Sequence, residues 1–215
     1  MKKIAVVLAG SGVYDGSEIH EATLTLLAIA RRGAVYQCFA PDVEQAHVVN
    51  HLTGEEMPEK RNVLVEAARI ARGNIKPLSQ YKAEDFDAIL FPGGFGAAKN
   101  LCTYAFDGAN CKVNPDVEKA VRSTVVAEKP VGALCISPVM ITKILGDVNV
   151  TIGDDQSTIE AIEIMGGSHK STGHGEIVTD EKYKVVTTPC YMLNATIDQI
   201  ADGAENVVNK VLELA

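Results

Sequence analysis

The feature that most constrains the fold is a regular alternation of short apolar runs with helix-like segments. Four runs rich in Val, Ile, Leu and Ala have the length of a strand, at 3–9, 34–40, 87–91 and 131–134. Their nearly continuous hydrophobicity is typical of parallel strands buried on both faces. Helical patterns separate them, at 17–32, 62–72 and 115–128. We therefore expect an α/β fold with a doubly wound, mostly parallel sheet between two layers of helices.

The last third of the chain predicts a hairpin and a closing helix. Residues 176–180 and 184–188 alternate in the way of paired strands, and 194–215 are helical, with Gly203 as the point where the helix could break. Residues 45–60 are polar without a period and are expected to form an inserted loop or lid. The chain has no repeat or linker and enough hydrophobic residues for one core, so we expect a single domain over 1–215.

Charge and cysteine content limit the partners and the location. The formal net charge is -8, which argues against a nucleic-acid partner because phosphate backbones need clustered Lys and Arg. No apolar stretch could cross a bilayer, and the run at 4–9 is too short for a signal peptide. The five cysteines form no CxxC pair and suit reduced thiols, so the sequence predicts a cytoplasmic protein with no metal site.

Ligands of such sheets bind outside the carboxyl ends of the strands, so the residues after each strand carry the functional signal. The glycines after the first strand are not a dinucleotide fingerprint, because Asp15 stands where the third glycine is needed. After the run at 87–91, Gly93 and Gly94 could turn backbone N–H groups toward an oxyanion. A tight strand-to-helix turn would explain the same two glycines.

The strongest candidate for a reactive residue is Cys135, which directly follows the apolar run at 131–134. A nucleophile elbow needs small residues two positions before and after its reactive residue, and Ala133 and Ser137 meet that condition. Ser137 could cap the next helix, with Pro138 at its first position, so that the helix dipole favours a thiolate. The alternative is an ordinary core cysteine.

Several strings of the sequence resemble the ElbB family, which belongs to the ThiJ/PfpI superfamily of class I glutamine amidotransferase-like domains. They are GSGVYDGSEIHEA, NHLTGE, RNVLVEAARIARG, PGGFGAAKN, GALCISP and KVVTTP, and they extend over essentially the whole chain. The resemblance implies a flavodoxin-like three-layer sandwich and a homodimer. It also implies Cys135 and Glu18 as the central pair, a cofactor-independent glyoxalase activity and a historical association with isoprenoid biosynthesis.

Two departures from the superfamily pattern affect the expected chemistry. Many members have a histidine directly after the nucleophile, where this chain has Ile136, and some have a thiol in the first glycine loop, where this chain has Ser11. Without a histidine, Glu18 would have to orient Cys135. Two adjacent ionised groups repel, so we expect the pair to share one proton, with a neutral carboxyl donating to a thiolate.

Further candidates would complete this site. The N–H groups of Gly93, Gly94 and Ile136 could hold an oxyanion. His169 and His174 follow the elbow in sequence, as a third catalytic residue often does in the superfamily, although either could be a solvated loop histidine.

The sequence thus predicts a glyoxalase that converts glyoxal, with methylglyoxal as a second candidate, to the 2-hydroxy acid. The reaction would pass through a hemithioacetal on Cys135, with a small dicarbonyl as partner and no cofactor. A thiol amidase or amidotransferase-like hydrolase is one alternative, weakened by the absence of a base to activate the thiol. A non-catalytic redox sensor or chaperone using the same cysteine is another.

Overall fold

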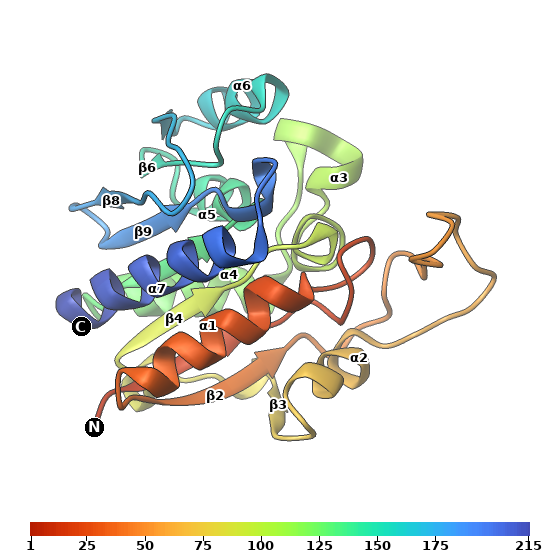
Figure 1. The fold of residues 1–215 in the computed structure, drawn as a ribbon, viewed down its shortest axis with the longest axis horizontal. Helices are drawn as coiled ribbons and strands as arrows, with labels where there is room; N and C mark the ends of the chain where they lie inside the picture. Colours follow the sequence, from red (N-terminus) through yellow and green to blue (C-terminus); the bar gives the residue numbers. More distant parts are fainter.

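A seven-stranded sheet forms the centre of the protein, whose computed structural model describes residues 1–215. Its spatial order is β3-β2-β1-β4-β5-β9-β8 (Figure 1). The strands are β1 Lys3–Val7, β2 Val35–Ala40, β3 Ile75–Pro77, β4 Ala88–Phe91, β5 Val131–Leu134, β8 Val178–Asp180 and β9 Val185–Thr188. All neighbours are parallel except β8 and β9, which form the predicted antiparallel hairpin.

Helices cover both faces of this sheet, so the predicted flavodoxin-like three-layer sandwich is confirmed. The first face packs against α1 Ile19–Arg31, α2 Val63–Ile70 and α7 Ile197–Leu214. The second packs against α4 Pro115–Val126, α5 Ser137–Leu145 and, further out, α6 Gln156–Ile164. In Figure 1, α1 and α7 lie side by side in front of the central strands.

Shorter elements connect the strands and helices. They are α3 Tyr104–Asp107, the small parallel pair β6 Asn149–Val150 and β7 Ser168–His169, the π-helical turn η3 Ala97–Leu101, and the 3-10 turns η1 Leu78–Gln80, η2 Ala83–Asp85, η4 Gly108–Asn110 and η5 Cys190–Met192. None of the helices combines the length and the apolarity needed to cross a bilayer.

Two helices differ from the sequence prediction in detail. Glu18, not Ser17, is the N-cap of α1, because the hydroxyl of Ser17 accepts a hydrogen bond from the N–H of Ala9 at 2.8 Å. Helix α7 continues without a break through Gly203. A Cβ there would lie 3.1 Å from Oγ1 of Thr188, so the glycine lets the helix approach β9 closely.

The segment 45–60 is an excursion from the body, as predicted, and Figure 1 shows it reaching away from the sheet. An antiparallel bridge between Val49 and Glu56 closes it on itself. At its base, the N–H of Val49 donates to the buried carboxylate of Asp15 at 2.7 Å, and that of Ala46 donates to Asn100 at 2.9 Å. The segment is therefore anchored on the loop that follows β1 and on η3.

Candidate active site

Cys135 occupies a sharp turn between β5 and α5. Its φ is 59°, a left-handed conformation that is strained for a residue with a side chain. The strand ladder holds it there, since the N–H of Cys135 donates to the carbonyl of Thr188 at 2.9 Å. Ile136 is the N-cap of α5, and the hydroxyl of Ser137 donates to the carbonyl of Pro92 instead of capping the helix. The turn has the strained geometry expected of an elbow.

The loop after β4 packs directly against this turn. A Cβ on Gly93 would lie 2.4 Å from Cβ of Cys135 and 2.9 Å from its Sγ, so only glycine fits. The carbonyl of Gly93 accepts from the N–H of Glu18 at 2.9 Å, and its own N–H donates to Oε2 of Glu21 at 2.9 Å. The N–H of Gly93 is thus already used, which argues against its predicted role in holding an oxyanion.

The carboxyl group that meets the thiol belongs to Glu21. Glu21 is fully buried in the first turn of α1, and it lies close enough to Cys135 for a hydrogen bond between the two side chains. Its Oε1 accepts from the N–H of Tyr191 at 3.3 Å. The prediction of Glu18 as the partner needs correction: Glu18 is the N-cap, and its Oε2 accepts from the N–H of Glu21 at 2.7 Å.

Burial controls the protonation of this pair. Burial, and after it the negative charge of Glu18, raises the pKa of Glu21 to about 7. Burial also raises the pKa of Cys135 well above its usual range, with the charge of Glu21 acting in the same direction. These two effects outweigh the dipole of α5, which was expected to favour a thiolate at Cys135. The pair of Glu21 and Cys135 therefore holds at least one proton at neutral pH.

Two backbone N–H groups point toward the sulfur. The N–H groups of Gly94 and Ile136 form hydrogen bonds to Cys135 that oppose the rise of its pKa. They are the donors nearest to an oxygen that would develop on a carbon bonded to that sulfur. Of the three predicted oxyanion donors, these two lie in a suitable position.

A cavity of about 390 Å³ opens next to the thiol. Nine of its fourteen lining residues are hydrophobic, and they come from the β1 loop, the β4 loop, η3, α3, the elbow and η5. The lining residues are Val13, Glu18, Gly94, Phe95, Ala98, Tyr104, Ala105, Cys135, Ile136, Asp155, Ser157, Thr158, Tyr191 and Met192. No residue of the segment 45–60 is among them, so that segment is not a lid over this cavity.

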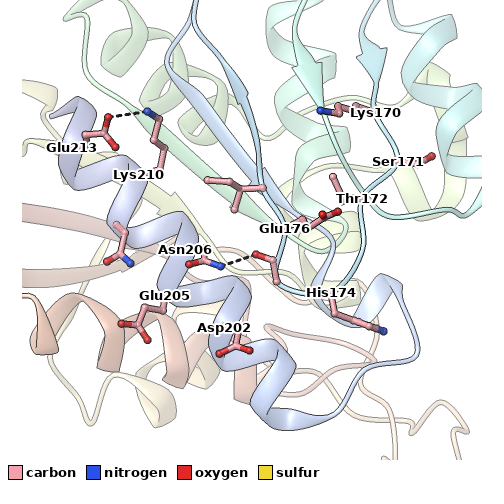
Figure 2. A pocket seen from close by; sticks show the side chains of 13 residues that line it. Lys170, Ser171, Thr172, His174, Glu176, Asp202, Glu205, Asn206, Lys210 and Glu213 are labelled. Atoms are coloured by element: carbon pink, nitrogen blue, oxygen red, sulfur yellow. Dashed lines mark hydrogen bonds and ion pairs between the residues drawn. The ribbon is translucent and has the colours of Figure 1, made fainter.

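The predicted histidines lie elsewhere. Nε2 of His169 accepts from the N–H of Ile152 at 3.2 Å within the small β6–β7 unit. His174 borders an open polar groove along α7, together with Asp202 and Asn206 (Figure 2). Neither residue lines the cavity at Cys135, so the structure does not bring either predicted histidine to the thiol.

Comparison with known proteins identifies relatives over the full length of the chain. The ES1 protein homolog, mitochondrial, of Rattus norvegicus is 48% identical over 222 residues, which cover 99% of this chain and 84% of the rat protein. The human glutamine amidotransferase-like class 1 domain-containing protein 3, mitochondrial, is also 48% identical and is covered to 83%. No family model matches.

Solved structures show the same relationship. The isoprenoid biosynthesis protein with amidotransferase-like domain from Ehrlichia chaffeensis has a TM-score of 0.94 and 37% identity, covering 100% of this chain and 99% of that one. Glyoxalase III of Candida albicans has a TM-score of 0.63 at 15% identity, covering 99% and 97%, and shows a shared fold alone. The amidotransferase-like part of the expected resemblance is confirmed, whereas membership of the ElbB family stays a prediction.

The same comparison corrects the predicted location. Both the rat and the human relatives are named mitochondrial proteins. The prediction of a cytoplasmic protein is therefore wrong, because reduced thiols and an acidic charge are equally compatible with the mitochondrial interior and do not distinguish the two compartments.

Proposed function

Because the chain belongs to the family of ES1 and glutamine amidotransferase-like class 1 domain proteins, we propose that it uses their amidotransferase-like fold for a cofactor-independent glyoxalase reaction at Cys135. The observation that carries this proposal is the buried contact between the thiol of Cys135 and the carboxyl group of Glu21 at the wall of an apolar cavity. A thiol, a carboxyl group titrating near neutrality and two N–H donors are what such a reaction needs.

The proposed reaction begins when the sulfur of Cys135 adds to the aldehyde carbon of glyoxal. The thiol proton passes to the Glu21 carboxylate, and the new hemithioacetal oxygen faces the N–H groups of Gly94 and Ile136. The carbon-bound hydrogen of the hemithioacetal then leaves as a proton and a proton is added at the neighbouring carbon, through an enediol. One carbon is oxidised to a thioester and the other reduced to an alcohol. Water hydrolyses the thioester to glycolate and frees the thiol.

The two alternatives fit this site less well. Amide hydrolysis requires protonation of a leaving amine, usually by an imidazole, and no histidine lines the cavity. A redox sensor requires a thiol that ionises easily and reaches solvent, whereas Cys135 is 7% exposed and burial raises its pKa. Both properties instead suit a nucleophile that loses its proton only when a substrate is bound.

The experiment that tests the proposal is turnover of glyoxal and methylglyoxal by the purified protein, with glycolate and lactate measured as products in the presence of a chelator. We expect Cys135→Ala to abolish turnover and Glu21→Gln to lower kcat by about 10²-fold or more. Glu18→Gln is the matched control, because it changes a carboxyl group of the same cavity that does not contact the sulfur, and it should cost roughly tenfold or less. Normal turnover by Cys135→Ala would disprove the proposal.

A further inference from the structure

The cavity beside Cys135 is larger than the smallest dicarbonyl requires. It measures about 390 Å³, whereas glyoxal has four non-hydrogen atoms and displaces roughly two or three water molecules of about 30 Å³ each. Most of the cavity would then remain filled with water. A substrate that uses the available space must carry a substituent on the second carbonyl.

The wall that such a substituent would meet is apolar. Phe95, Tyr104, Ile136 and Met192 line it, from four separate elements. Burial of apolar area is favourable by about 25 cal/mol per Å², so an alkyl or aryl group would bind this wall better than a polar one. The site can therefore bind substituents larger than methyl more tightly than methyl itself.

The charged groups of the cavity all have the same sign. Glu18 and Asp155 line it, and no Lys, Arg or His does. Hydrogen bonds from Thr158 and Ser157 lower the pKa of Asp155, so this side chain is ionised at neutral pH. Its carboxylate caps α6 by accepting the N–H of Thr158 at 2.9 Å, so the N-terminus of that helix already carries a negative charge.

Two basic side chains contact lining residues without lining the cavity themselves. Nζ of Lys99 donates to the carbonyl of Tyr14 at 2.8 Å and lies 5.4 Å from the ring centroid of Phe95. Nδ1 of His20 is 2.8 Å from the hydroxyl of Tyr191. Among the lining residues an anion would thus meet two carboxyl groups and no cation, which disfavours its binding by repulsion.

We propose that the cavity selects neutral 2-oxoaldehydes whose substituent is apolar and larger than methyl, and rejects those that carry a carboxylate. This selectivity rests on the proposed glyoxalase function and names its substrate class. Asp155 is then a specificity-determining residue: it repels anions without taking part in the bond changes at Cys135.

The test compares kcat/KM for four dicarbonyls at one pH: methylglyoxal, 4-methyl-2-oxopentanal, 4,5-dioxopentanoate and the methyl ester of the last. The first two differ only in the size of an alkyl group, and the last two mainly in charge. We expect 4-methyl-2-oxopentanal to exceed methylglyoxal by about tenfold or more, and the ester to exceed the acid by at least a similar factor. Equal values within either pair would overturn the selectivity.

Two matched variants test the proposed repulsion of anions by Asp155. Asp155→Asn removes the charge while keeping a side chain that caps helices well. We expect it to reduce the gap, the ratio of kcat/KM for the ester to kcat/KM for the acid, by about threefold or more. Asp154→Asn removes the neighbouring, exposed charge that does not line the cavity and should leave the gap unchanged. An unchanged gap in Asp155→Asn would overturn the role of Asp155. Absence of turnover with all four compounds would instead refute the glyoxalase function itself.

Discussion

The carboxyl group of Glu21 reaches the thiol of Cys135 from a different layer of the fold. Glu21 lies in the first turn of α1 and Cys135 at the carboxyl end of β5, and the Cα of Gly93 separates them closely enough that a Cβ there would lie 2.7 Å from Oε2 and 2.9 Å from Sγ. Both groups are buried, the charge of Glu21 raises the pKa of Cys135, and the hydrogen bond with Cys135 lowers the pKa of Glu21. Their titrations are therefore linked, and this can be measured.

The first prediction concerns the reactivity of Cys135 with iodoacetamide. Burial and the charge of Glu21 raise the pKa of Cys135, so labelling of the wild type should be slow at neutral pH and increase steeply in the alkaline range. Glu21→Gln removes the negative charge, and the labelling curve should move to lower pH. The variant would then label faster while turning over dicarbonyls more slowly.

The labelled residue has to be identified by peptide mass spectrometry. The pKa of Cys111 is lowered by its hydrogen bond with Cys102, so Cys111 is a second site at which alkylation could occur. Only the peptide containing Cys135 bears on the pair. Coincident curves for this peptide in wild type and Glu21→Gln would show that the two groups are not coupled.

The second prediction is a loss of stability as pH rises. The pKa of Glu21 is raised from 4.5 in the unfolded chain to about 7 in the folded protein, so the folded state binds this proton more tightly. The stabilisation of the folded state by this proton is complete below pH 4.5 and is lost as pH rises through 7. The difference corresponds to about 3 kcal/mol of unfolding free energy. Urea unfolding at a series of pH values measures it.

Glu21→Gln provides the control for this pH dependence, because glutamine has nearly the same shape and no proton to lose. Its unfolding free energy should be flatter between pH 4.5 and 7 than that of the wild type. Parallel curves for the two proteins would assign the pH dependence to other groups and would contradict the raised pKa.

The sequence predicted the position of the nucleophile but not that of its partner. Cys135 is recognisable because the requirement for small flanking residues is local. Glu18 and Glu21 are one helical turn apart, and choosing between them requires the start and the rotation of α1. A usable signal was present, since Glu21 continues the buried face formed by Thr25 and Ile29 at helical spacing, whereas Glu18 precedes the first turn.

In the fold, too, some elements can be predicted from the sequence and others cannot. The strands β4 and β5, and β1 after Lys3, are buried on both faces, so their sequences are apolar and predictable. Strand β2 is buried only over its second half, 38–40. Strand β3 has three residues at the edge of the sheet, and α3 has four, so neither has a period that a sequence can display. Yet α3 supplies Tyr104 to the cavity, so the sequence alone could not describe the wall opposite the thiol.

The third prediction tests the close packing at Gly93. In Gly93→Ala the new Cβ would lie 2.4 Å from Cβ of Cys135, which the rigid elbow can relieve only by moving. We expect a loss of stability of about 1–3 kcal/mol and a fall in kcat of roughly 10²-fold from the displaced sulfur.

Gly173→Ala is the matched control for Gly93→Ala. The nearest atom to a Cβ there is 3.6 Å away, an ordinary contact, and the residue lies outside the cavity. Thermal unfolding and turnover of the two variants should therefore differ clearly. Wild-type values for Gly93→Ala would mean that the loop after β4 is not as tightly fitted to the elbow as the distances require.

The fourth prediction separates the histidines from the chemistry. His174 lies in the polar groove along α7, His169 binds the N–H of Ile152, and neither lines the cavity, so we expect neither to exchange a proton with a group at Cys135. His174→Ala should change kcat/KM by roughly twofold or less, and its pH–rate profile should keep the limb near 7 that belongs to Glu21. The decisive readout is that limb: if it disappeared in His174→Ala, a histidine and not Glu21 would be the group that titrates. If it disappears in Glu21→Gln and persists in His174→Ala, the carboxyl group carries the proton.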